Sequence, residues 1–143
     1  MTRPHAAAVL AAAVGLAAGR AGAMSGPPLD YTLACAGCHR ADGGGTPGSI
    51  PPLAGSVARF LRVAGGREFL ARVPGVAQAP LDDAALAGVL NWMLARFDPA
   101  HLPAGFVPYD AAEVGRLRHE PLIDVEGVRE RLLEAIGHRR FSP

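Results

Sequence analysis

The feature that most constrains this chain is the run Cys35-Ala36-Gly37-Cys38-His39, which contains both of its cysteines. Residues three and four apart lie on one face of a helical turn, so two thiols at this spacing can bond a flat ligand while the next side chain reaches its centre. The spacing is typical of covalent haem attachment, and a neutral imidazole is a common ligand of haem iron. The run therefore predicts one covalently bound haem c, held by Cys35 and Cys38, with His39 as the proximal axial ligand.

Three other uses of the two cysteines agree less well with the rest of the sequence. A thiol–disulfide redox pair would be expected after a strand in a βαβ pattern, which the sequence does not show. A zinc site needs further Cys or His residues at ligand spacing, and none are clustered near the run. A structural disulfide suits an oxidising compartment but would close a very short loop. Haem attachment is the interpretation that the other features support.

The N-terminal region is typical of a secretory signal peptide. Arg3 and His5 precede an uninterrupted run of small apolar residues from 6 to 18, and Ala21-Gly22-Ala23 supplies small residues for cleavage. The run is shorter than the roughly 20 residues that a membrane-spanning helix needs. We therefore expect residues 1–23 to be removed on export to the periplasm, leaving a mature chain without a membrane span.

The charge balance argues against a nucleic-acid partner. The whole chain has a formal net charge of +1, and residues 1–23 contain two arginines, Arg3 and Arg20, but no acid. The mature chain is therefore nearly neutral, whereas nucleic-acid binding calls for a basic stripe or a high isoelectric point. We expect no nucleic-acid partner.

The rest of the chain predicts short helices separated by turns rich in glycine and proline. Helices are expected from Tyr31 into the haem motif, after Ser56, over 67–73, over 81–97, after Asp110 and after Asp124. The clearest is 81–97, which begins behind Asp82 as N-cap and carries one apolar stripe of Leu86, Leu90, Met93 and Phe97. Asp30 and Ser56 are expected to cap their helices, and Leu33 is expected to face inward. Because no strand alternates with these helices, the fold class is all-α.

Taken together, the haem motif, the glycine-rich stretch 41–48, Pro51-Pro52-Leu53 and a helix with an aromatic residue near its end resemble the class I cytochrome c family over roughly residues 29–97. The resemblance implies a small all-α domain wrapped around one haem, over residues 24–98, followed by a C-terminal helical extension, 99–143. It also implies that the carbonyl of Pro51 or Pro52 holds the proximal imidazole, and that Trp92 packs the last domain helix on the first. Pro52 and Trp92 are the further cofactor contacts that we expect.

The sequence departs from that family at the sixth iron position. The family usually presents a methionine from the loop before its terminal helix, but residues 73–80 contain none. Met93, at a position that touches haem in the family, is our first candidate for the sixth ligand, and core packing is the competing role. Gln78, an open or water-filled position, and the later histidines are the alternatives: His101, His119 and His138.

Four arginines, Arg59, Arg62, Arg67 and Arg72, share a stretch that contains one acid, Glu68. Arginine suits a bidentate contact with a carboxylate, so one of them is expected to pair with a haem propionate and others to steer a partner. A solvated helix face is the competing interpretation.

These features predict a periplasmic electron carrier rather than an enzyme, one that exchanges electrons with a periplasmic dehydrogenase or terminal oxidase. Two alternatives remain at this point. The haem could have an open sixth position that binds a gas or peroxide, or the chain could be the haem subunit of a larger redox complex, with residues 99–143 as a docking arm. Packing over the domain's own surface is the other role for 99–143, because bare apolar stripes would form an exposed patch.

Overall fold

The computed structural model describes residues 26–139, so the predicted signal peptide, 1–23, lies outside the described residues. The elements in chain order are α1 (Pro27–Ala34), α2 (Ala36–His39), η1 (Val57–Arg62), α3 (Gly66–Arg72), α4 (Pro74–Ala77), α5 (Asp83–Phe97), η2 (Pro99–His101), α6 (Ala111–Arg118) and α7 (Val125–Arg139). Within 26–139 there is no strand, only an isolated bridge between Thr46 and Ile50. The predicted all-α fold class is confirmed. No helix in this range has the length and apolar character of a membrane span.

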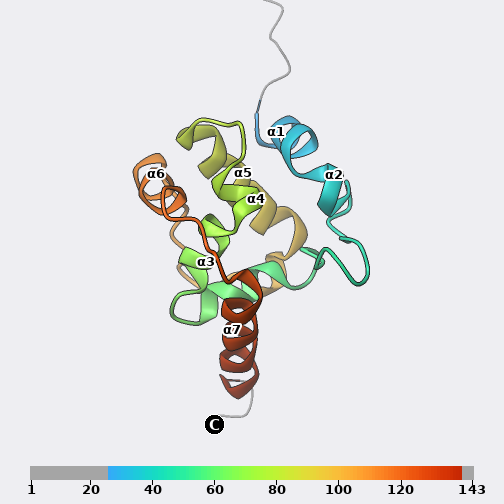
Figure 1. Ribbon diagram of the computed structural model, residues 1–143, viewed down its shortest axis with the longest axis vertical. Helices are drawn as coiled ribbons and strands as arrows, with labels where there is room; N and C mark the ends of the chain where they lie inside the picture. The colour runs from blue at the N-terminus through green and yellow to red at the C-terminus, as the bar shows by residue number, and fades with distance from the viewer. Residues whose placement is uncertain (1–25, 140–143) are drawn as a thin grey trace, which may run out of the picture.

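Helix α5 is the centre of the fold. Its N-terminus is capped as expected, because the Asp82 carboxylate accepts a hydrogen bond of 2.8 Å from the backbone N–H of Ala85. The predicted stripe of Leu86, Leu90, Met93 and Phe97 is buried. Helix α1 packs on α5 from one side and α6 from the other, so α5 lies between α1 and α6 (Figure 1).

Helix α1 differs from the expectation in two ways. It begins at Pro27 behind Gly26, so Asp30 lies within the first turn and caps nothing. Leu33, expected to face inward, is 76% exposed, whereas Tyr31 is only 2% exposed. Residues two apart point to nearly opposite sides of a helix, so Tyr31 and Leu33 cannot both face α5. The tyrosine buries the larger ring and also finds a hydrogen-bond acceptor, as described below.

The helix after Ser56 is a 3₁₀ turn, η1, and Ser56 does not cap it. The Ser56 hydroxyl instead donates to the carbonyl of Pro52, at 2.5 Å. A residue distant in sequence takes over the cap: the buried carboxylate of Asp98 accepts from the backbone N–H of Ala58, at 2.9 Å. The other oxygen of that carboxylate contacts the ring of His101, so the turn after α5 is tied to the start of η1.

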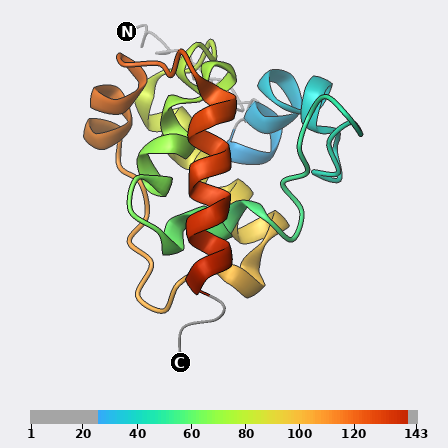
Figure 2. The same ribbon diagram turned by 60° about the horizontal axis from the view of Figure 1, so that its bottom comes forward.

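The extension folds back onto the preceding helices. Helix α6 begins behind Asp110, which accepts from the N–H of Glu113 at 2.8 Å, and α7 begins behind Asp124, which accepts from the N–H of Gly127 at 2.9 Å. The predicted apolar stripe of α7, formed by Val125, Val128, Leu132 and Ile136, packs against the core. Helix α7 contacts η1 and α3 and crosses the front of the molecule in Figure 2.

Candidate haem site

The haem motif forms a single turn at the junction of α1 and α2. The backbone N–H of Cys35 donates to the carbonyl of Tyr31, at 2.8 Å, and the carbonyl of Cys35 accepts from Cys38 and His39, at 3.2 and 3.0 Å. Cys35 and His39 are half-buried, Cys38 is exposed, and both thiols are free. One helical turn thus brings together the three side chains that the spacing predicted.

The environment of the thiols argues against a redox-active pair. Burial raises the pKa of the Cys35 thiol, and the neighbouring Cys38 raises it further. A thiol–disulfide exchange site needs the opposite, a lowered pKa that favours the thiolate. Residues 26–139 also hold no group of three His, Cys, Asp or Glu side chains that could bind a metal ion, which argues against zinc.

The surroundings of His39 favour the neutral form of its imidazole. Burial lowers the pKa of its imidazole, and the nearby carbonyl of Pro51 offsets part of that effect. A neutral imidazole is the form that binds haem iron. The Nδ1 atom is buried and makes no hydrogen bond of good geometry with any described residue. Of the two prolines, Pro51 is the one whose carbonyl lies beside His39, whereas the carbonyl of Pro52 accepts from Ser56. Pro52 stays a predicted cofactor contact.

The glycine-rich stretch brings Pro51 to the motif. Gly45 has φ +68, and a Cβ there would collide with the backbone of Ile50 and Pro51. Gly43 has φ +70, and a Cβ would lie 2.8 Å from the ring of Phe97. Both positions need glycine for the conformation and for the space. The N–H of Gly45 also donates to the carbonyl of His39, at 3.1 Å, which folds the stretch back onto the motif.

An aromatic cluster joins the motif helix to α5. The ring of Tyr31 lies 5.3 Å from Trp92 and 5.1 Å from Phe97, centroid to centroid, and the last two rings are 5.5 Å apart in an edge-on arrangement. Such tilted pairs are favourable beyond the area that they bury. Trp92 therefore packs α5 against α1, the contact expected of it.

The candidates for the sixth ligand occupy different environments. Met93 is buried in the core on α5, Gln78 is exposed, and the ring of His101 is engaged by Asp98. His119 is exposed at the end of α6, across α5 from the motif (Figure 1). The side chain of His138 lies outside the described residues. Met93 stays our prediction for this position.

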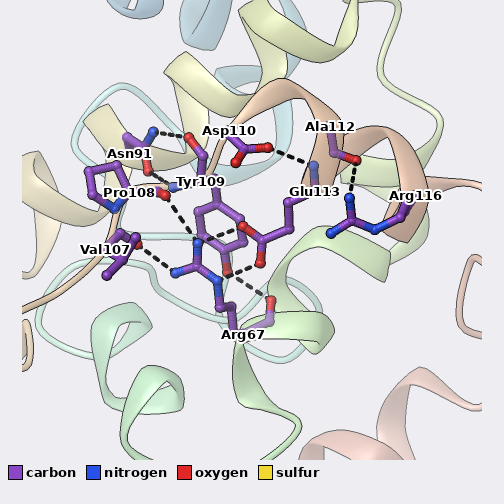
Figure 3. A network of polar contacts seen from close by, with 9 residues as sticks. All are labelled: Arg67, Asn91, Val107, Pro108, Tyr109, Asp110, Ala112, Glu113 and Arg116. Atoms are coloured by element: carbon purple, nitrogen blue, oxygen red, sulfur yellow. Dashed lines mark hydrogen bonds and ion pairs between the residues drawn. The ribbon is translucent and has the colours of Figure 1, made fainter.

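Three of the four arginines bind the extension, a role that the sequence analysis missed. Arg67 pairs with Glu113, with Nε 2.5 Å from Oε1, and lies 4.0 Å from the ring of Tyr109 (Figure 3). Arg62 and Arg72 donate to backbone carbonyls of the extension, those of His101 and Glu120, at 3.1 and 2.6 Å. These contacts span 39 to 48 residues of sequence, so no local pattern could reveal them.

Arg59 is the fourth arginine, and it differs from the others. Its Nε atom is buried and has no hydrogen-bond partner within the described part of the chain. A buried polar nitrogen without a hydrogen-bond partner is costly. Together, Arg59 Nε and His39 Nδ1 are the buried side-chain atoms left without partners in 26–139. The Nδ1 atom of His39 lies beside the Pro51 carbonyl, which leaves the other ring nitrogen for iron, and a haem propionate would supply a carboxylate to the Arg59 guanidinium, so these residues fit the group.

The fold and the site together define a small helical protein with a covalent haem-attachment turn. Residues 26–96 match the family model of cytochrome c. The chain is 38% identical over 115 residues to cytochrome c-552 of Thermus thermophilus, an alignment that covers 68% of this chain and 88% of the relative. It has the same identity over the same length to cytochrome c-552 of Thermus thermophilus strain ATCC 27634 / DSM 579, covering 78% of that chain.

The chain belongs to the cytochrome c family. Membership implies a covalently bound haem c, iron binding and a role as a haem electron carrier.

Proposed function

We propose that this protein carries single electrons in the periplasm, between a periplasmic dehydrogenase or respiratory-chain donor and an oxidase, and that it is not itself an enzyme. The observation that carries the proposal is the Cys35–His39 turn with its neutral imidazole; in addition, the buried Nε atom of Arg59 on η1 has no partner within the described residues. Cys35 and Cys38 would form the thioether bonds, His39 and Met93 would be the axial ligands, and Arg59 would meet a propionate. When bound, the haem supplies one-electron oxidation and reduction.

The chain's own residues set the conditions for that chemistry. His39 stays neutral because burial lowers its pKa, and the carbonyl of Pro51 lies where it can orient the ring. The cluster of Tyr31, Trp92 and Phe97 excludes water behind the motif, which lowers the local dielectric and helps to set the reduction potential. Cys38 is exposed, so a partner protein can approach the haem-bearing turn closely.

The periplasmic location rests on residues 1–23, whose charge, apolar run and small residues fit a cleaved signal peptide. The mass of the protein recovered from the periplasm tests it. We expect a chain that begins near Met24 and carries one haem. A protein that retained residues 1–23 would contradict the location but leave the haem site untouched.

Axial ligation is tested by the ferric and ferrous absorption spectra of the holoprotein and its Met93→Ala variant. We expect an altered spectrum in both oxidation states, because a thioether ligand is lost. Leu90→Ala is the matched control, since Leu90 is buried on the same stripe of α5 and has no ligand atom. A Met93→Ala spectrum that equals that of Leu90→Ala would eliminate Met93 as the ligand.

A second function, binding of a gas or peroxide at an open sixth position, is favoured by the segment between α3 and α5. This segment contains no methionine, and Arg118 fixes it by donating to the carbonyls of Ala77, Leu81 and Ala79, at 3.0, 2.7 and 2.6 Å. Mixing the reduced protein with carbon monoxide separates the two functions. Rapid formation of a complex at full occupancy would support the open site, and slow or absent binding would support the six-coordinate carrier.

Residues 99–143 support a role within the protein's own domain rather than as a free docking arm for a larger complex. Arg67, Arg72 and Arg118 make their contacts between this extension and the helices of the haem domain. The test is the solution size of the holoprotein. We expect a monomer, whereas a stable assembly that is lost when 99–143 is removed would favour the complex.

A further inference from the structure

The residue that follows His39 has a strained backbone. Arg40 has φ 64 and ψ 163, and it is the one residue other than glycine with a positive φ in the described range 26–139. This region of conformational space is essentially reserved for glycine, because a Cβ collides with the backbone there. Such a conformation persists only where the surrounding structure enforces it.

The Arg40 side chain does not enforce this conformation. It is 62% exposed, and its Nε atom lies 3.8 Å from Asp42 in an exposed ion pair, an arrangement that contributes little. The backbone contacts are better defined. The N–H of Arg40 donates to the carbonyl of Ala36 at 2.8 Å, and its carbonyl accepts from the hydroxyl of Tyr31 at 2.8 Å and from the N–H of Gly43 at 3.2 Å.

Tyr31 is the one side chain in this set of contacts, and it is firmly placed. It is 2% exposed, and its ring packs against Trp92 and Phe97 of α5. Burial, and then the charges of Cys35 and Asp42, raise the pKa of Tyr31 to about 12, so the hydroxyl remains a donor at neutral pH. A continuous path therefore runs from α5 through Tyr31 to the carbonyl of Arg40, the residue that follows His39.

We propose that Tyr31 is a positioning residue for His39: its hydroxyl holds the backbone of Arg40 in the left-handed conformation and thereby fixes the imidazole and tunes the reduction potential. The inference rests on the proposed role of His39 as the iron ligand. The ring of Tyr31 stabilises the helix contact, whereas the hydroxyl acts on the ligand through one backbone carbonyl.

The experiment compares four holoproteins: wild type, Tyr31→Phe, Arg40→Gly and the double variant. Tyr31→Phe should raise the midpoint potential, because an imidazole held less firmly donates less to ferric iron. It should also raise the unfolding equilibrium constant about fivefold, the effect of one lost hydrogen bond. Arg40→Gly removes the strain without removing the contact, so its potential should match that of wild type and its stability should exceed it.

The double variant carries the decisive comparison. A glycine at position 40 adopts the conformation without help, so the potential of the double variant should return close to the wild-type value. If the hydroxyl had only a structural role, Arg40→Gly would not restore the midpoint potential of Tyr31→Phe. An unchanged potential in Tyr31→Phe, or an equal shift in both backgrounds, would overturn the proposal.

Tyr109→Phe is the matched control. The hydroxyl of Tyr109 donates to the carbonyl of Arg67 at 2.7 Å, and its ring is also buried, but it joins α3 to the extension. This variant should lose stability to a similar extent and keep the wild-type potential. An equal shift of potential in Tyr109→Phe would assign the Tyr31→Phe result to general loosening and overturn the proposal.

Two further results keep the inference separate from the proposed function. If His39→Ala leaves the wild-type spectrum unchanged, the assignment of the ligand fails, whatever Tyr31→Phe does. If neither Tyr31 variant assembles with haem, Arg40→Gly is compared with Arg40→Ala, which keeps the Cβ. Arg40→Gly should then be more stable, and equal stability would overturn the proposal.

Discussion

The haem-bearing first part of the molecule, residues 26–62, and the extension, 99–139, satisfy their polar groups in different ways. The first part contains two buried nitrogens, on His39 and Arg59, that have no hydrogen-bond partner among the described residues. The extension instead supplies acceptors to arginines of the earlier helices, as Glu113 does for Arg67. The first part thus contains a buried Arg59 nitrogen that a haem carboxylate would satisfy, whereas the polar groups of the extension are paired with the protein's own arginines.

Arg118 shows how the extension achieves this. Its side chain is 13% exposed and donates to three carbonyls of residues 77–81 and to the carboxylate of Asp83. Backbone carbonyls around a short helix such as α4 lack partners within the helix, and a planar guanidinium can satisfy several at once. The extension thereby stabilises the segment that leads into α5.

The largest effect should come from removing both attachment points. The double variant Cys35→Ala/Cys38→Ala should carry no pigment on a denaturing gel, because no thioether can form. Hydrogen exchange then tests the comparison: amide protection should fall more in α1 and η1 than in α6, since the first part loses the group that completes it. An equal loss of protection in all three helices would show that the two parts are not distinct.

Arg118→Ala should destabilise the protein by about 2–4 kcal/mol, because several buried carbonyls lose a charged donor at once. Arg116→Ala is the control on the same helix, since Arg116 is exposed and, among the described residues, bonds only the carbonyl of Ala112 in its own helix. The control should change stability by less than about 0.5 kcal/mol. Chemical denaturation measures the stability of both variants. Similar losses of stability would show that Arg118 does not hold the segment.

Each part also contains a buried tyrosine whose pKa is raised, chiefly by burial: Tyr31 to about 12, and Tyr109 likewise upward from 10. A raised pKa favours the protonated form in the folded state, so the stability that each contributes is complete below pH 10 and is lost as the pH rises above it. Tyr31→Phe and Tyr109→Phe should each reduce the loss of stability above pH 10. The thioether bond removes the charge of Cys35, which is one cause of the raised pKa of Tyr31. The alkaline loss of stability due to Tyr31 should therefore differ between apoprotein and holoprotein, whereas that due to Tyr109 should not. Unfolding measured between pH 9 and 12 tests this.

The smallest effect concerns the ion pairs of the extension. Glu113→Gln should cost about 1 kcal/mol, because the paired side chains of Arg67 and Glu113 are largely shielded from solvent. Glu120→Gln should cost almost nothing, since Glu120 is 78% exposed and 3.9 Å from Arg72. Equal costs in thermal unfolding would mean that burial does not distinguish the two pairs.

Local patterns predicted most of the fold and the centre of the site. The stripe of α5, the caps Asp82 and Asp110, and the Cys35–His39 turn all depend on spacings within one or two helical turns. The misassigned residues were those decided by distant contacts. Asp98, 40 residues away from Ala58, caps η1 in place of Ser56. Leu33 is exposed because Tyr31 packs against α5 instead.

The roles of the arginines follow the same rule. Composition placed four of them in one stretch, but only the fold shows which of them meet an acceptor in the extension and which, Arg59, is left for another group. The sixth ligand is beyond local reasoning for a related reason. Residues 73–80 contain no methionine, so a methionine ligand must come from a position that tertiary packing brings to the iron.

The packing of α7 against η1 and α3 has a consequence for the order in which the chain matures. Leu132 lies within 3.8 Å of the position that a Cβ on Gly65 would take, so elements early in the chain obtain their final covering from its last helix. A chain made from the N-terminus presents Cys35, Cys38 and His39 well before that covering exists. In a chain exported from its N-terminus, the attachment turn would therefore reach the haem-attachment machinery before α7 covers η1 and α3.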